Sequence, residues 1–524
     1  MTTEPIRSIL VIGGGTAGWL SACYLQRALG ATVRVSLVES KNIGRIGVGE
    51  ATVSSLRWTM KFLGLAEEDW MPHAGATYKT AVRFEQWTRP ESAGAEHFYH
   101  PFFERQEPMV SPIPTFFPEV GDGISLMHYW HRRHLAGDPT PYAYAVFPGP
   151  AICDARKSPR FEAAAEHEIP TAYHLDAHRF QTFLARKSIE RGVEHLLDDI
   201  TDVLLAEDGS IAGLRTAEHG IIAADLYIDC SGFRSVLLGG ALKEPFLSSA
   251  NHLWCDSAVA MRPANAPGDI EPYTLARASD AGWIWNIPLY HRAGAGYVYS
   301  SRYKTKEEAE LELRTYLGPR ADVDTFTAHL KFTPGRRARA WVKNCVGIGL
   351  AANFIEPLES TTIFLIEYAL ANLVALFPDR AFAPARADRY NRTVGQIYDE
   401  IRDFIILHFL GSPRRDTPFW RDLKDIDVPP ALAQELEFYR INLPMGERFR
   451  NFIFRERSYA CLLSGLGVLP KEPYPLLSHA PVGEETARRA FEAIAARSDD
   501  LARRLPGQRE FLEHLYRKGG VEFA

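Results

Sequence analysis

A glycine-rich turn near the N-terminus constrains the fold of this chain more than any other feature. It runs Gly13-Gly14-Gly15-Thr16-Ala17-Gly18 and follows the short apolar segment 9–12. Glycines in the pattern G-x-G-x-x-G, between a buried strand and a helix, allow a tight turn and a close approach of the backbone to a pyrophosphate. An acidic residue about 20 positions further on, here Glu39, can accept a hydrogen bond from a ribose hydroxyl. The predicted nucleotide-binding residues are Gly13, Gly15, Thr16, Ala17, Gly18 and Glu39.

Other segments complete a discontinuous nucleotide module. We expect strands over 8–12 and 32–38 around a helix over 17–29, and further buried strands near 225–234 and 345–349. A helix is expected from about Pro357 to Phe377, and loops over 107–123 and 148–171. The predicted fold is α/β, a Rossmann-like nucleotide-binding module over 1–385 with insertions around 55–172. A mainly helical region over 386–524 would complete the substrate site.

Bulk composition excludes several classes of protein. At 524 residues the chain exceeds the roughly 250–300 residues that one core supports, so more than one core is expected. A net charge of −6 gives no basic field, and nucleic acid is therefore not an expected partner. Six cysteines without a CxxC pair predict neither a metal site nor a disulfide framework and fit a reducing cytoplasm. Since no stretch approaches about 18–20 apolar residues, we expect no membrane span.

The segment Gly282-Trp-Ile-Trp-Asn-Ile-Pro288 carries two tryptophans two positions apart. In an extended strand such residues point to the same face, so Trp283 and Trp285 could form a flat aromatic wall beside a bound ring. Taken alone, the pair would more often be ordinary core or rim aromatics of a strand.

A second motif, Pro357-Leu-Glu-Ser-Thr-Thr362, opens the expected helix. Proline is tolerated in a first turn, and the free N–H groups of a helix N-terminus stabilise an anion. Glu359 is by itself explained as an acidic partner of the helix dipole. An isolated lysine such as Lys79 is ordinarily a solvated surface residue.

Together these motifs resemble the flavin-dependent halogenases of the tryptophan halogenase family. The matching segments are the glycine turn, 44–52, Lys79-x-Ala-x-Arg-Phe84, the Trp-x-Trp-x-Ile-Pro segment and Pro-Leu-Glu-Ser-Thr. The resemblance implies that FAD binds and that further cofactor contacts come from Gly49, Glu50, Ala51, Gly349 and Pro357. It also implies an enzyme of the cytoplasm that uses FADH₂, O₂ and halide. With only one nucleotide fingerprint, FADH₂ would come from a separate NAD(P)H-dependent flavin reductase. A homodimer is compatible with this family.

The resemblance assigns roles to individual residues. Halide would bind at Ser360, Thr361 and Thr362, and hypohalous acid would pass to Lys79, which delivers an electrophilic halogen to the substrate ring. Glu359 would assist loss of the ring proton. Trp283, Trp285, Ile287 and Pro288 would keep the substrate away from the flavin, and the substrate contacts would be His100, Phe102 and Ile453.

Two departures from the tryptophan enzymes bear on specificity. The chain passes almost directly from Leu443-Pro444 to Phe449, without the segment that binds the amino-acid backbone, and Ile453 stands where an indole-stacking tryptophan is expected. Thr362 replaces a glycine next to the halide site. We therefore expect bromination or chlorination of an indole or a related electron-rich aromatic, small or part of a larger molecule, rather than of free tryptophan. Alternatives are a flavin-dependent aromatic hydroxylase and a non-catalytic flavin-binding protein.

Overall fold

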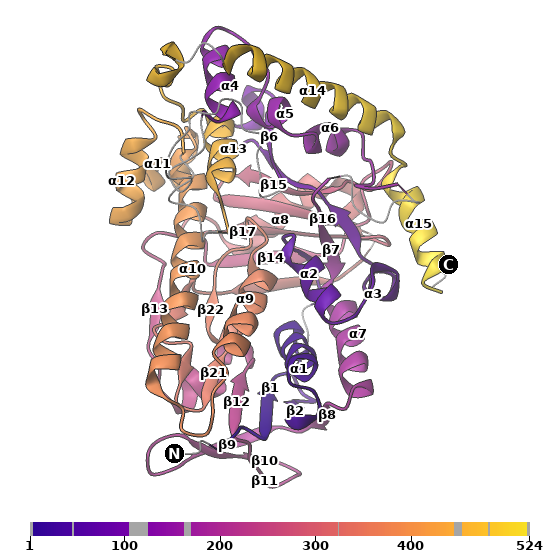
Figure 1. The fold of residues 1–524 in the computed structure, drawn as a ribbon, viewed down its shortest axis with the longest axis vertical. Coiled ribbons are helices and arrows are strands. Elements are labelled where there is room, and N and C mark those ends of the chain that lie inside the picture. The colour runs from indigo at the N-terminus through magenta and orange to yellow at the C-terminus, as the bar shows by residue number, and fades with distance from the viewer. Residues whose placement is uncertain are drawn as a thin grey trace.

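The computed structural model describes residues 4–43, 47–103, 124–161, 169–322, 324–444, 453–479 and 483–520. A six-stranded sheet in the lower half of Figure 1 forms the nucleotide module. Its order is β20 (Trp341–Val342), β21 (Cys345–Gly347), β12 (Leu226–Asp229), β1 (Ser8–Ile12), β2 (Arg34–Glu39) and β8 (Glu194–Leu197). All neighbours from β21 to β8 pair in parallel, so strands more than 300 residues apart in sequence form one sheet, as predicted.

Helices cover this sheet because their apolar faces pack on it. α1 (Thr16–Leu29) lies between α7 (Ala177–Glu190) and α9 (Thr362–Ala375), and all three contribute to one buried core. Gly18 allows α1 to approach the turn that precedes it, because a Cβ at this position would lie 1.7 Å from the carbonyl oxygen of Gly13. The predicted strand–turn–helix–strand unit over 8–39 is confirmed.

A second, largely antiparallel sheet forms the upper half of the molecule (Figure 1). Its order is β18 (Thr327–Lys331), β14 (Ser257–Met261), β17 (Ala293–Tyr299), β16 (Gly282–Pro288), β15 (Tyr273–Ser279), β5 (Ala81–Glu85) and β6 (His97–Pro101). β16 is central and is buried along its whole length. This sheet belongs to a core separate from that of the nucleotide module, so the expectation of more than one core is confirmed.

A small three-stranded sheet lies between the two halves. Its order is β3 (Gly49–Ala51), β7 (Ala172–Asp176) and β4 (Thr77–Lys79). The remaining small sheets are β9 (Ile200–Leu205) with β10 (Ile211–Thr216) and β11 (Ile221–Ile222), and β13 (Phe246–Ser248) with β19 (Gly335–Arg337) and β22 (Asn353–Phe354). The helices of the inserted regions are α2 (Ser55–Phe62), α3 (Glu67–Ala74), α4 (Leu126–Leu135), α5 (Tyr142–Val146), α6 (Gly149–Asp154) and α8 (Lys306–Leu317).

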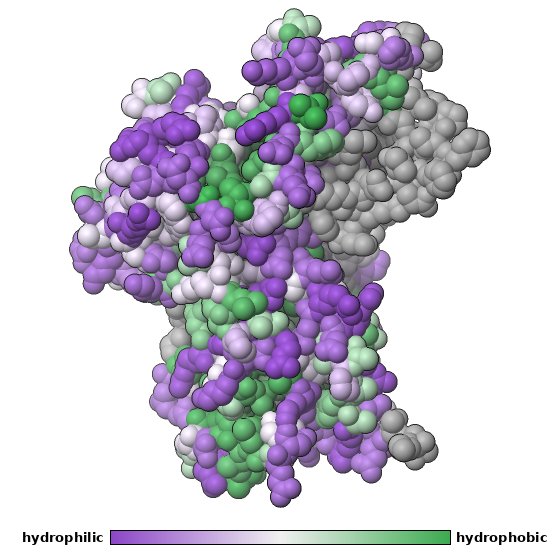
Figure 2. All heavy atoms as spheres, turned by 90° about the vertical axis from the view of Figure 1, so that its left-hand side faces the viewer, coloured by the Kyte–Doolittle hydropathy of each residue, from purple (hydrophilic) through white to green (hydrophobic). Residues whose placement is uncertain are grey.

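The C-terminal part of the chain is helical, as predicted. It contains α10 (Pro384–Gly411), α11 (Pro418–Asp422), α12 (Pro430–Phe438), α13 (Glu456–Leu466), α14 (Gly483–Arg504) and α15 (Gln508–Lys518). α14 crosses the top of the molecule in Figure 1 and packs on α5 and α6, and α15 returns to α3. The face over α10, α12 and β13 is mostly hydrophilic, with smaller apolar patches (Figure 2). None of the described helices is long and apolar enough to cross a membrane.

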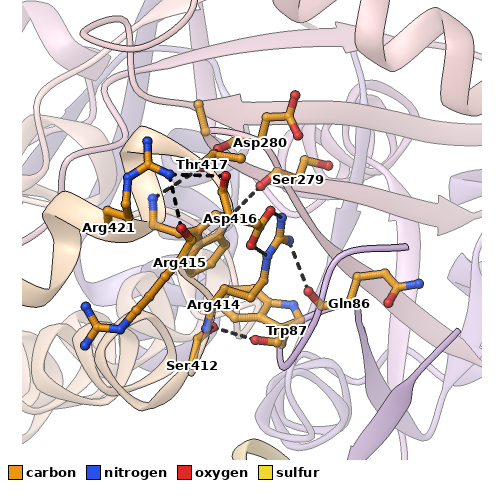
Figure 3. Close-up of polar contacts among 12 residues, drawn as sticks. Gln86, Trp87, Ser279, Asp280, Ser412, Arg414, Arg415, Asp416, Thr417 and Arg421 are labelled. Atoms are coloured by element: carbon orange, nitrogen blue, oxygen red, sulfur yellow. Dashed lines mark hydrogen bonds and ion pairs between the residues drawn. The ribbon is translucent and has the colours of Figure 1, made fainter. Parts of the chain in front are cut away.

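The proline-containing segment after α10 is fastened to the upper sheet by a buried polar cluster (Figure 3). Ser412 Oγ donates to the Trp87 carbonyl (2.5 Å), and the buried Arg414 donates to the Gln86 carbonyl (3.1 Å) while pairing with Asp416 (2.7 Å). The Trp420 indole then packs edge-on against Trp87 at a centroid distance of 5.8 Å. These contacts hold Trp87 against His408 and Phe409 near the C-terminal end of α10.

Two sequence-based expectations were wrong. The helix expected from Pro357 begins only at Thr362, because Ser360 adopts a left-handed conformation (φ +61°) that interrupts helical geometry. The expected loop over 148–171 contains α6, whose burial against its neighbours outweighs the proline and glycine at its start. The predicted loop over 107–123 lies outside the described residues.

Candidate active site

A cavity of about 360 Å³ opens at the carboxyl ends of β1 and β2. Gly13, Gly15, Thr16, Glu39 and Glu50 line it, among other residues. A Cβ at Gly15 would meet no atom of the described chain within 4 Å, so the space beside this glycine is open to a ligand. At Gly13 (φ +105°) a Cβ would lie 2.4 Å from the Cys230 carbonyl oxygen, so the turn requires glycine. The shape and backbone donors of this cavity suit a dinucleotide.

The other predicted cofactor residues do not line this cavity but lie in the elements around it. Ala17 and Gly18 lie in the first turn of α1, and a Cβ at Gly349 would be 2.8 Å from that of Ala17. Gly49 and Ala51 flank Glu50 in β3. Burial raises the pKa of Glu50 to about 7. Pro357 lies in the turn before α9.

Lys79 ends β4 and is fully buried. Its Nζ donates to the Thr52 carbonyl (3.1 Å) and to Ser360 Oγ (2.8 Å), and it lies 5.2 Å from the Phe102 ring centroid. Burial lowers the pKa of this amine to about 7, against the opposing negative charge of Glu359. The solvated-surface interpretation of Lys79 is therefore wrong. Thr52 follows β3 directly, so one short segment joins the lysine to the nucleotide cavity.

The segment before α9 brings the other polar groups to the lysine. Ser360 donates its N–H to the Pro357 carbonyl (3.0 Å) and turns the chain, leaving Thr361 as the N-cap of α9. Thr361 Oγ1 is buried and has no hydrogen-bond partner among the described residues. Pro357 thus precedes the helix by a full turn, and the helix N-terminus begins at Thr362. The predicted halide residues lie together beside Lys79.

Glu359 is buried between two histidines. His100 Nδ1 lies 3.0 Å from both carboxylate oxygens, and His408 Nε2 lies 2.9 Å from Oε1. Burial opposes ionisation, but the hydrogen bonds and charges of His100 and His408 outweigh it and lower the pKa of Glu359 to about 2. Because Glu359 lies outside the helix, its interpretation as a dipole partner in the first turn is wrong.

Trp283 and Trp285 point from β16 to one face, as predicted, but do not form a flat wall. Their ring centroids are 6.2 Å apart and the planes are inclined by 55°. Trp283 Nε1 donates to Glu356 Oε2 (2.7 Å), which tilts the ring toward the segment before α9. Burial raises the pKa of Glu356 to about 8, opposed by this hydrogen bond. A Cβ at Gly296 on β17 would lie 2.0 Å from Trp285, so glycine leaves room for that ring.

Aromatic side chains enclose the other side of Glu359. Phe454 stacks on Phe404 with a centroid distance of 4.1 Å and lies 6.1 Å from His100. The neighbouring Ile453 donates its backbone N–H to Glu400 (2.9 Å), and its side chain packs against the second core. The aromatic residue that this segment places beside His100 is thus Phe454, which the sequence analysis missed.

His408 is the other residue that the sequence analysis missed. It lies on α10, 49 residues from Glu359, and no local motif marks it. Only the register of α10 against β5 and the turn before α9 brings the two side chains together. The predicted segment around Phe449 lies outside the described residues.

The cavity and the buried lysine give this chain a nucleotide-binding site and a separate buried polar site, as in enzymes that use a nucleotide cofactor. The tryptophan halogenase family model matches residues 8–482. The chain is 41% identical to tryptophan 6-halogenase SttH of Streptomyces toxytricini, with 98% of both chains covered. It is 39% identical to tryptophan 7-halogenase RebH of Lentzea aerocolonigenes, covering 98% of this chain and 99% of RebH. This chain belongs to the tryptophan halogenase family of flavin-dependent enzymes.

Solved structures agree with this assignment. The SttH crystal structure superposes with a TM-score of 0.89 at 42% identity, covering 97% of this chain and 99% of SttH. The structure of BrvH, a flavin-dependent halogenase from Brevundimonas sp. BAL3, gives 0.86 at 35% identity, covering 97% and 99%. The family implies FAD. The open space beside Gly15 fits the pyrophosphate of this cofactor, and Glu39 at the end of β2 fits its ribose.

Proposed function

We propose that this protein is an FADH₂- and O₂-dependent halogenase that installs bromine or chlorine on an indole or a related electron-rich aromatic. The observation that carries the proposal is the buried Lys79 amine, which donates to Thr52 and Ser360 and interacts electrostatically with Glu359. A buried amine with a pKa near 7 is available in its neutral, nucleophilic form near neutral pH. A hydroxylase would have no use for such a group.

The glycine turn and Glu39 would hold FAD, with Glu50 near it in the same cavity. Bound in its reduced form, FAD would supply two of the four electrons that O₂ accepts, and the halide ion would supply the other two as it is oxidised to hypohalous acid. A separate NAD(P)H-dependent reductase would provide the reduced cofactor, since the chain has one nucleotide fingerprint. Ser360, Thr361 and Thr362 would bind the halide, because the unpartnered Thr361 hydroxyl and the start of α9 offer donors there.

Lys79 would carry the halogen to the ring. The neutral amine attacks the halogen of hypohalous acid: an N–halogen bond forms, the O–halogen bond breaks, and the departing hydroxide combines with the amine proton as water. The aromatic carbon then takes the halogen, the N–halogen bond breaks, and the electron pair stays on nitrogen, which takes up a proton from solvent and becomes the neutral amine again. Glu359 stabilises the cationic ring and accepts the proton released as aromaticity is restored.

Trp283 and Trp285 would separate the cofactor from the organic substrate. Both indoles are buried on the central strand β16, and Trp283 is also tied to Glu356. A substrate held by His100, Phe102 and the neighbouring Phe454 would then meet Lys79 and remain out of contact with the flavin.

Relatives of this chain are named for halogenation of tryptophan. We propose an indole ring as the shared substrate element, but not free tryptophan as the preferred molecule. The chain lacks the segment between Pro444 and Phe449 that would bind an amino-acid backbone, and it carries Ile453 in place of a stacking tryptophan.

Three other expectations stay predictions. They are a cytoplasmic location, a homodimeric state, and the boundary between the nucleotide module and the C-terminal region at residues 385 and 386.

A coupled assay tests the proposal. Purified protein, a flavin reductase, NADH, FAD, bromide or chloride and a panel of indoles should give mono-halogenated products by mass spectrometry. Lys79→Ala should give no halogenated product, with unchanged FAD binding and unchanged flavin oxidation by O₂, because the amine acts after hypohalous acid has formed. Incorporation of ¹⁸O from O₂ without halogen would identify a hydroxylase instead. Normal FAD binding with neither product would identify a non-catalytic flavin protein.

A further inference from the structure

The two nitrogens of His408 have unequal partners. Nδ1 lies 2.8 Å from the carbonyl oxygen of Phe404, one turn back on α10, and a carbonyl can only accept a hydrogen bond. Nδ1 therefore carries a hydrogen. Nε2 lies 2.9 Å from Glu359 Oε1, and a bare Nε2 facing an ionised carboxylate would place two acceptors against each other. One proton must accordingly lie between His408 and Glu359.

The surroundings decide on which side that proton lies. The titratable groups that face Glu359 are Lys79, His100 and His408, and the rings of Phe84, Trp87 and Phe404 enclose His408. His100 Nδ1 contacts both carboxylate oxygens, an arrangement in which an ionised carboxylate accepts and His100 donates. A carboxylate that accepts from both histidines satisfies all of these contacts, and in that arrangement the proton of the His408–Glu359 pair lies on Nε2.

A second buried glutamate provides an internal comparison. Glu356 and Glu359 are only 1% and 3% exposed and lie in the same turn. Glu356 accepts a hydrogen bond from the neutral Trp283 indole, and burial raises its pKa to about 8. For Glu359 burial acts in the same direction, but the two histidines reverse it and lower the pKa to about 2. The histidines thus account for the opposite directions in which the pKa values of the two carboxyls are shifted.

We propose that His408 is a positioning residue that holds a second ring proton on Nε2 and thereby keeps the buried Glu359 ionised for the halogenation step. This role rests on the proposed function of Glu359. Trp87 and the polar cluster of Arg414 pack behind His408 and hold it against the carboxylate. An ionised Glu359 stabilises the cationic ring that halogen transfer creates.

The proposal also describes how the ring proton leaves. The C–H bond of the cationic ring breaks, its electron pair restores aromaticity, and the proton forms an O–H bond with Glu359. The His408–Glu359 pair then holds two protons where its hydrogen bond needs one. The extra proton is consequently expelled to water or to the substrate-side His100, and the pair returns to its initial state. Glu359 is a weak base, which suffices because a cationic ring is a strong acid.

Nuclear magnetic resonance of ¹⁵N-histidine protein tests the protonation state without requiring any turnover. At pH 8 the His408 signals, assigned with His408→Gln, should be those of an imidazolium in the wild type. In Glu359→Gln they should become those of a neutral imidazole with a protonated Nδ1. A neutral His408 in the wild type at pH 8, or an imidazolium that persists in Glu359→Gln, would overturn the proposal.

Kinetics test the role in the reaction. The ratio of kcat/KM for His408→Gln to that of the wild type should fall at least twofold from pH 8 to pH 6, because Glu359 loses one of its two histidine donors and binds a proton more readily. The control His128→Gln, at a buried histidine on α4 that stacks on Tyr474, should give a ratio that does not change with pH. A merely structural role of His408 predicts the same constant ratio.

A double mutant separates action through Glu359 from general damage. In the Glu359→Gln background, His408→Gln should change kcat/KM by less than twofold at every pH, since the group that it protects is gone. Multiplicative losses would refute the coupling. If the wild type does not halogenate any ring, the proposed function fails, but the protonation state seen by nuclear magnetic resonance still accepts or rejects the His408–Glu359 arrangement.

Discussion

Replacing Lys79 with methionine should remove a pH dependence of stability that the protein owes to one buried amine. Burial lowers the pKa of Lys79 from 10.5 to about 7. Between these values the unfolded chain binds a proton that the folded chain does not, so the free energy of unfolding of the wild type rises as pH increases through this window. Conversely, the free energy of unfolding decreases as pH falls toward 7, because the unfolded chain carries an ammonium that must lose its hydration or its proton on folding.

The magnitude follows from the same two pKa values. Relative to Lys79→Met, the wild type should gain about 2–3 kcal/mol in free energy of unfolding between pH 6 and pH 9. For a chain of 524 residues this corresponds to a relative shift in Tm of roughly 2 °C. Methionine also leaves Thr52 and Ser360 without their donor, which costs roughly 1–3 kcal/mol for each group but does so equally at both pH values.

Scanning calorimetry or urea unfolding of both proteins at pH 6, 7, 8 and 9 measures this difference. Lys61→Met is the matched control, because Lys61 is exposed on α2 and should give parallel curves. Equal pH dependence of the wild type and Lys79→Met would show that the amine stays protonated in the fold. The halogenation mechanism would then need an ammonium that polarises hypohalous acid, and the neutral nucleophile would be excluded.

Three further predictions concern the same site. Glu356→Gln should abolish a fall in stability of about 3 kcal/mol from pH 5 to pH 7.5, because the folded carboxyl, with a pKa raised to about 8, retains a proton that the unfolded chain has lost; unfolding curves whose difference ignores pH would contradict this. Indole should exceed L-tryptophan in kcat/KM by at least tenfold, about 1.4 kcal/mol of transition-state binding, and steady-state kinetics showing the reverse preference would locate a backbone clamp elsewhere in the chain. Bromide should react faster than chloride at equal concentration, because it is more easily oxidised and Thr362 adds bulk beside the halide site; a mainly chlorinated product in a competition assay would sink this idea.

Local sequence patterns predicted the parts of the molecule whose geometry is itself local. The glycine turn, its flanking strands and the helix after it were found because each needs only neighbouring residues. The start of α9 was misplaced because proline favours a first turn, whereas the left-handed Ser360 is imposed by contacts with β4. Side-chain pairs across distant elements left no pattern to find. His408 and Phe454 reach Glu359 and His100 only through packing of α10 and of the segment before α13.

The three-residue strand β3 has a consequence for engineering this enzyme. Glu50 on β3 lines the cofactor cavity, and two residues later the Thr52 carbonyl accepts the hydrogen bond of Lys79. A displacement of this extended backbone at Glu50 would also move the Thr52 carbonyl. Cofactor binding in the cavity and the position of the Lys79 amine are therefore coupled. We therefore expect variants of this strand that have a different cofactor affinity to change also the proposed halogen transfer by Lys79. Engineering of this strand should therefore measure cofactor affinity and halogenation activity on the same variants, because a change in one is expected to accompany a change in the other.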